Sequence, residues 1–132
     1  MSIDTTIHLI GKYRLDGLIS CVSKFLGFQL VLDKQWLDEE KELIFRGYTS
    51  GLFIHCSNQS FEDDPPFIFS EYNYVISITD DPTKRVLGEE YKDYVISFSK
   101  VLGAYCAETL KDKSEVIYGY YELIETYDYR DR

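Results

Sequence analysis

Residues 86–113 read VLGEEYKDYVISFSKVLGAYCAETLKDK and form the longest periodic segment of the chain. From Leu87 to Tyr105 its apolar residues recur at spacings of three and four, which is the pattern of one face of an α-helix. Acidic residues come early in the segment and lysines come at its end, as the helix dipole favours. We expect a long helix here, with its first residue left open because Gly88 lies inside the pattern.

Shorter elements flank this helix. A second helix is expected at residues 15–26, where Asp16 can cap the start and Gly27 can end it in a left-handed turn. The residues Thr49-Ser50-Gly51 separate two strand-like runs and predict a hairpin. The strands expected from their β-branched and aromatic content are residues 3–10, 28–32, 43–48, 52–56, 67–69, 74–79 and 116–123.

This order of elements predicts an α+β fold. We expect an antiparallel or mixed sheet of about five to six strands with two main helices packed on it. The regular alternation of a doubly wound parallel sheet is missing. A length of 132 residues fits a single domain over residues 1–132, and the polar residues 125–132 are expected to be a frayed tail.

The expected lack of a signal peptide and the spacing of the cysteines indicate a cytoplasmic protein. Asp4 and His8 interrupt the only candidate for a signal peptide, and no stretch has the 18 or so apolar residues that a transmembrane helix needs. Cys21, Cys56 and Cys106 are widely spaced and form no C-x-x-C pair, so reduced, buried thiols are expected rather than a disulfide framework.

The chain carries no catalytic motif. It lacks G-x-S-x-G, a P-loop and G-x-G-x-x-G, and its two histidines, His8 and His55, do not lie at metal-ligand spacing. His55 and Cys56 are neighbours in an expected strand, so their side chains point to opposite faces and cannot form a catalytic pair with each other. We therefore expect no enzyme, no cofactor and no metal site.

The negative charge is concentrated in one part of the chain. The net charge is −9, from 23 acidic and 14 basic residues, and residues 35–81 alone contribute −8. Such acidity argues against nucleic acid or an anionic membrane as a direct partner, and it favours a basic protein. Trp36 and Phe61 lie in polar stretches of this segment and are candidate interface anchors, whereas Tyr48 and Phe67 lie in expected strands and favour the core.

Size, acidity and α+β pattern together resemble those of bacterial immunity proteins, which protect cells from polymorphic and contact-dependent toxins. The resemblance includes the acidic runs DEEKE (38–42), FEDDPP (61–66) and TDDP (79–82). It implies a chain that binds and neutralises a cognate toxin domain, and the expected toxin is a basic nuclease. The expected partner-binding residues are Trp36, Asp38, Glu39, Glu40, Glu42, Phe61, Glu62, Asp63 and Asp64.

Two alternatives stay open. A small-molecule-binding or enzymatic domain would line a pocket with Tyr74, Tyr118 and Tyr120 and would direct His55 or Glu122 into it. A structural subunit of a larger complex would instead show an exposed apolar patch on the long helix.

Overall fold

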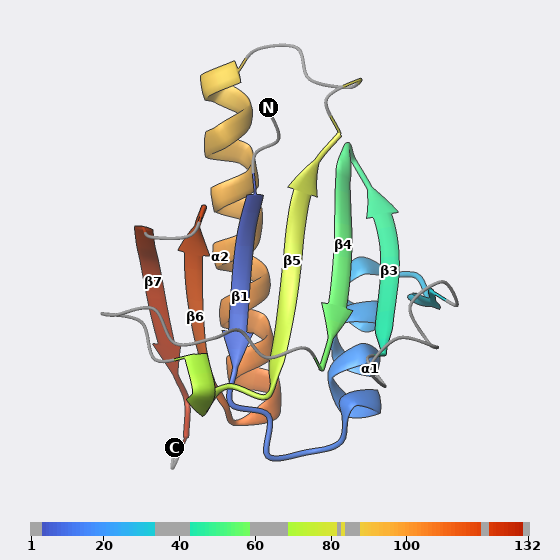
Figure 1. Ribbon diagram of the computed structural model, residues 1–132, viewed down its shortest axis with the longest axis vertical. Coiled ribbons are helices and arrows are strands. Elements are labelled where there is room, and N and C mark those ends of the chain that lie inside the picture. The colour runs from blue at the N-terminus through green and yellow to red at the C-terminus, as the bar shows by residue number, and fades with distance from the viewer. Residues whose placement is uncertain are drawn as a thin grey trace.

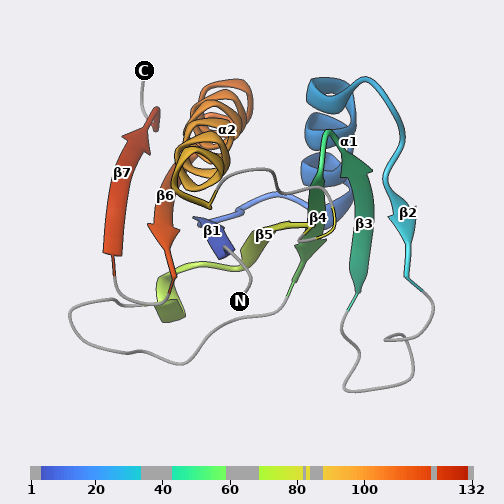
Figure 2. The same cartoon turned by 90° about the horizontal axis from the view of Figure 1, so that it is seen from above.

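The computed structural model describes residues 4–33, 43–58, 69–81, 83, 88–119 and 122–130. Within this part of the chain, seven antiparallel strands form one sheet in the order β2-β3-β4-β5-β1-β6-β7. Figure 1 and Figure 2 show two helices side by side on one face of this sheet. The α+β class is confirmed, and the sheet has slightly more strands than the five to six expected.

The elements have the following bounds. The strands are β1 Asp4–Leu9, β2 Val31–Leu32, β3 Ile44–Thr49, β4 Leu52–Ser57, β5 Tyr74–Asp80, β6 Lys113–Tyr118 and β7 Glu122–Asp128. The helices are α1 Leu15–Leu26, the short 3-10 helix η2 Phe69–Glu71 and α2 Gly88–Leu110.

The end of α1 follows the sequence prediction, but its start does not. Gly27 adopts a left-handed conformation with φ of 84°, and its N–H donates to the Ser23 carbonyl over 2.9 Å. The N-cap position is occupied by Arg14, which has an extended backbone and makes no capping side-chain bond. The prediction that Asp16 caps the helix is wrong, because Asp16 lies in the first turn, where its charge faces the positive helix end.

The main core lies between the helices and the sheet. Alternate strand residues point toward the helices, so the isoleucines of β1 and β5 meet leucines of α1 and α2. At Gly103 the α2 backbone approaches β6 closely, since a Cβ there would lie 2.9 Å from Val116 Cγ2. The fully buried side chains of this core include Ile7, Leu9, Leu18, Val22, Ile54, Ile76, Ile78, Leu102 and Val116.

The sheet face away from the helices is named here the outer face. Its part over β1 and β6 is covered by η2 and the residue that follows it, and we call this part the covered half. Phe69 stacks on His8 with ring centroids 4.7 Å apart and packs on Ile117, while Tyr72 meets His8 edge-on. Figure 2 shows η2 on the side of the sheet opposite the helices.

The C-terminal part of the sheet differs from the sequence prediction. Residues 116–123 do not form one strand, because Gly119 turns the chain with φ of 61° between β6 and β7. The expected fraying is wrong for residues 125–128, which belong to β7 and pair with β6. Ile124 and Tyr127 pack against the core, and this burial holds the strand in place.

Candidate functional site

The part of the outer face over β2, β3 and β4 carries large side chains that remain exposed. We call it the open half, and it contains a hollow of about 490 Å³. Val31 is 60% exposed, Tyr48 41% and Phe53 38%, in contrast to the buried Phe69 of the covered half. The side chains that form the open half are Val31, Arg46, Tyr48, Phe53 and His55.

The strand register brings these side chains together. Arg46 of β3 lies between Val31 of β2 and His55 of β4, and Tyr48 lies opposite Phe53 in the next row. The Tyr48 and Phe53 rings pack at a tilt, with centroids 5.0 Å apart. The Tyr48 hydroxyl donates to Asp81 Oδ2 over 3.1 Å, which fixes the ring at the rim of the hollow. The open half is therefore a preorganised aromatic surface.

Charge in the open half is arranged around His55. Burial is the main cause that lowers the pKa of His55, and the positive charge of Arg46 acts in the same direction, while Asp33 opposes both. His55 is therefore neutral at pH 7 and can be covered by a partner without burying a charge. Arg46 is exposed and carries the positive charge of the hollow.

The two acidic segments of the sequence leave the sheet at one corner. The Leu43 N–H donates to Asn58 Oδ1 over 3.0 Å, and the Asp33 N–H donates to the Ile44 carbonyl over 2.8 Å. Asp33 and Leu43 border segment 34–42, and Asn58 precedes segment 59–68. The two bonds therefore hold the ends of both segments at the same end of the sheet. Both segments are thus tied covalently to the end of the strands that form the open half.

The expected partner-binding residues all lie outside the described residues. These are Trp36, Asp38, Glu39, Glu40, Glu42, Phe61, Glu62, Asp63 and Asp64. Tyr48, which the sequence placed in the core, is instead exposed on the open half. Phe53 was missed, although the alternation of β4 contains the signal: Leu52, Ile54 and Cys56 point inward, so Phe53 must point outward.

The described members of the expected tyrosine pocket do not converge. Tyr74 lies opposite Leu9 of β1 and Tyr118 lies opposite Thr5, so the two are separated by four residues, or about 13 Å, along the strand. Tyr74 packs on Tyr13, and Lys92 Nζ lies 4.4 Å over the Tyr118 ring.

The remaining residues of that pocket do not complete it. Tyr120 lies outside the described residues, and Glu122 is exposed. His55 lies on the outer face, whereas Tyr74 and Tyr118 lie on the helix side of the sheet.

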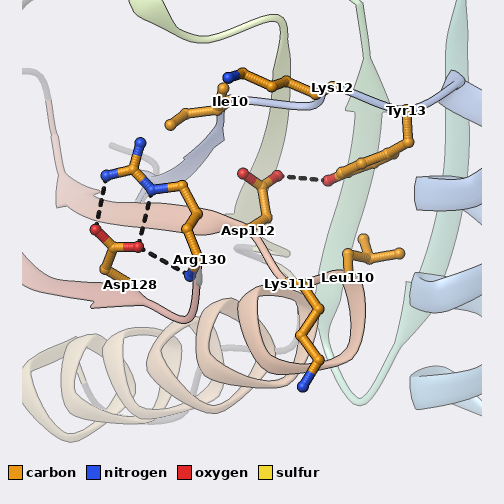
Figure 3. A pocket seen from close by; sticks show the side chains of 8 residues that line it. All are labelled: Ile10, Lys12, Tyr13, Leu110, Lys111, Asp112, Asp128 and Arg130. Carbon is orange, nitrogen blue, oxygen red and sulfur yellow. Dashed lines mark hydrogen bonds and ion pairs between the residues drawn. The ribbon is translucent and has the colours of Figure 1, made fainter. Parts of the chain in front are cut away.

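A second hollow, of about 610 Å³, lies at the end of the sheet around Asp112, as Figure 3 shows. The residue after α2, Lys111, is left-handed with φ of 53°, which turns Asp112 back toward the loop between β1 and α1. Asp112 Oδ2 accepts bonds from the Gly11 N–H over 3.1 Å and from the Tyr13 hydroxyl over 2.7 Å. Its Oδ1 accepts the Lys113 N–H over 2.7 Å.

The polar groups of the Asp112 hollow bond to one another and hold the fold together. Both carboxylate oxygens already accept bonds from the protein, and burial together with Asp112 raises the pKa of Tyr13, so the phenol stays a donor. Arg130 is paired with Asp128 through Nε and Nη2, at 2.9 Å and 2.7 Å. Figure 3 shows Lys111 extending away from Asp112. In this hollow Asp112 therefore acts as a structural clamp between the end of α2 and the loop that precedes α1.

The other sequence predictions concern cysteines, metals and membranes. Cys21, Cys56 and Cys106 are buried free thiols, as expected. Within the residues that the structure describes, His, Cys, Asp and Glu do not gather in threes as metal ligands would. None of the helices in this part of the chain has the length and apolar character needed to cross a bilayer.

Comparisons of the chain with models of protein families, with curated proteins and with solved structures find no match. The functional argument therefore depends on the geometry of the open half and on the charge of the chain.

Proposed function

We propose that this chain is an immunity protein that binds a cognate toxin domain and neutralises it. The observation that carries the proposal is the open half: an exposed, ordered aromatic surface whose strands end where two acidic segments leave the sheet. An active site is not needed for such a role, because covering the toxin's catalytic groove is sufficient to inhibit it.

The composition of the open half suits a protein interface. Tyrosine and arginine are enriched among the residues that dominate binding energy, and Tyr48, Phe53 and Arg46 lie within one hollow. Tyr48 is held at its rim by Asp81, so little side-chain freedom is lost when a partner packs on it. The hollow has room for one or two side chains of the partner.

The charge suits a basic partner. Residues 35–81 contribute −8 of the net charge, and the two acidic segments within them connect to the strands of the open half at Asp33, Leu43 and Asn58. A nuclease that must attract phosphate presents a basic groove, and clustered carboxylates speed its capture through long-range attraction. We infer that Asp38, Glu39, Glu40, Glu42, Glu62, Asp63 and Asp64 supply this attraction, and that Trp36 and Phe61 add apolar contacts.

The place of action would be the cytoplasm of a bacterial cell. Three buried free thiols suit a reducing compartment, and a toxin delivered by contact or secretion reaches its intracellular targets there. The immunity protein would then meet the toxin domain at its site of action.

The test is neutralisation of the toxin domain encoded beside this chain's gene. We expect co-expression of the chain to restore growth to cells that produce this domain, and the purified pair to form a complex whose association slows as salt is added. The Tyr48→Ala/Phe53→Ala variant should fold as the wild-type chain does and yet fail to restore growth.

Two results would contradict the proposal. One is full rescue by the Tyr48→Ala/Phe53→Ala variant, which would exclude the open half. The other is the absence of any complex between the wild-type chain and the domain, which would exclude the immunity function with that partner.

A further inference from the structure

Two of the three cysteines meet between the helices. Cys21 of α1 and Cys106 of α2 place their Sγ atoms 3.9 Å apart, which is contact distance for two thiols. Figure 2 shows why: α1 and α2 lie side by side on the same face of the sheet. A disulfide has an S–S length of about 2.05 Å, so the two sulfurs would have to approach by a further ~2 Å to form one.

The two thiols differ in their access to solvent. Cys21 is 6% exposed, whereas Cys106 is fully buried. Cys21 is therefore the residue of the pair that lies nearer to solvent, and Cys106 is in contact with it. Cys56, the third thiol, is fully buried on β4.

The surroundings favour an anionic sulfur on Cys21. The hydrogen bond with Cys106 is the main cause that lowers the pKa of Cys21; the Thr109 hydroxyl and the charge of Lys24 act in the same direction, and burial opposes them. The same hydrogen bond, together with burial, raises the pKa of Cys106. The thiolate is the nucleophilic form of cysteine, so Cys21, the less deeply buried residue of the pair, is also the more reactive one.

We propose that Cys21 and Cys106 are a peroxide-reactive pair that forms an intramolecular disulfide, independently of the proposed immunity function. The Cys21 thiolate attacks one oxygen of a hydroperoxide; the O–O bond breaks, Cys21 becomes a sulfenic acid, and the other oxygen leaves as an alcohol or water after taking up a proton. The Cys106 sulfur then attacks the Cys21 sulfur, the S–O bond breaks, and water leaves with the Cys106 proton. Two thiols lose two electrons in total, and one hydroperoxide is reduced.

The consequence is a covalent link between α1 and α2. Such a link restricts the unfolded chain and therefore raises resistance to unfolding. Because both sulfurs lie in the helix layer, the open half on the opposite face keeps its geometry. The oxidised chain should thus be more stable while its binding surface is unchanged.

The experiment treats the purified full chain with hydrogen peroxide, unfolds it and alkylates the remaining thiols. The untreated chain should take up three labels and the oxidised chain one, on Cys56. Peptide mapping should find Cys21 joined to Cys106, and urea unfolding of the oxidised chain should have a higher midpoint that reductant reverses.

Three single variants sharpen the result. The Cys56→Ala variant should still lose both remaining thiols, whereas Cys21→Ala and Cys106→Ala should form no internal link. In Cys106→Ala, dimedone should trap a sulfenic acid on Cys21. If a variant fails to fold, peptide mapping of the wild-type chain decides the matter alone.

Three outcomes would overturn the proposal. The first is retention of all three thiols after peroxide treatment. The second is a link that uses Cys56. The third is oxidation of Cys21 without a bond to Cys106.

Discussion

The covered half and the open half belong to the same face of one sheet, yet their aromatic side chains differ in burial. Over β1 and β6, Phe69 and Tyr72 close the face and bury His8. Over β2 to β4, Tyr48 and Phe53 pack on each other and stay exposed. Among the residues that the structure describes, aromatic side chains cover the outer face over β1 and β6 and stay exposed over β3 and β4.

This difference in burial predicts that the covered half contributes to the free energy of unfolding and that the open half contributes to binding. A ring that fills the covered half adds to the free energy of unfolding, because it removes apolar surface from water. A ring in the open half keeps about two fifths of its surface exposed, and under the proposed function a partner buries it. Changes in the two halves should consequently affect different measurements.

The largest expected effect is on stability in the covered half. Phe69→Ala should lower the free energy of unfolding by about 3 kcal/mol, because it removes a buried ring that packs on His8 and Ile117. Phe53→Ala, the matched change in the open half, should lower it by less than about 1 kcal/mol. Urea unfolding of both variants measures this contrast, and equal losses would remove the distinction between the halves.

The second effect is a dependence of stability on pH that belongs to the covered half. Burial lowers the pKa of His8 to about 4, from about 6.5 in the unfolded chain. Between these values the unfolded state binds the proton and the folded state does not, so the stabilisation is complete above pH 6.5 and is lost as the pH falls toward 4. We expect a decrease of about 2 to 3 kcal/mol between pH 7.5 and 4.5 in urea unfolding.

Two histidine variants test whether His8 causes this dependence of stability on pH. His8→Gln should remove most of the slope, since it leaves no imidazole to protonate beneath Phe69. His55→Gln should leave most of it, because His55 is only half-buried on the open half, although burial lowers its pKa in the same direction. A slope that persists in His8→Gln would assign the pH dependence to other groups.

A smaller effect is expected on the rate of association. Neutralising Glu62, Asp63 and Asp64 to Gln and Asn should slow association with a basic partner by roughly tenfold at low salt and leave the unfolding free energy unchanged. Glu122→Gln/Glu125→Gln on β7, at the opposite edge of the sheet, is the control and should slow association less for each charge removed. Stopped-flow mixing across a salt series measures both rates, and equal slowing would argue against steering by the segment.

The sequence predicted the elements whose signal is local. The periodicity of residues 87–105 predicted α2, and Gly27 predicted the end of α1. The alternation around His55 and Cys56 correctly assigned their side chains to opposite faces of β4. These features depend on neighbouring residues only, so no knowledge of the sheet order was needed.

What the sequence did not predict depends on contacts between distant residues. Asp112 bonds to Gly11 and Tyr13, which precede it by 101 and 99 positions. The β6–β7 hairpin was missed because Gly119 is followed by two tyrosines, which read as a continued strand rather than a turn. Tyr48 was placed in the core because an aromatic residue in a strand gives no sign of which half of the outer face η2 covers.

The most direct test of the central claim compares affinities for the toxin domain that the proposed immunity function requires. Tyr48→Ala/Phe53→Ala should weaken binding by roughly 30-fold or more, as loss of dominant interface residues does, and leave the chain folded. Val101→Ala is the matched control, since Val101 is 57% exposed on α2, and it should leave the affinity unchanged. An affinity within twofold of wild type for the double variant, or an equal loss for Val101→Ala, would contradict the assignment of the open half as the binding surface.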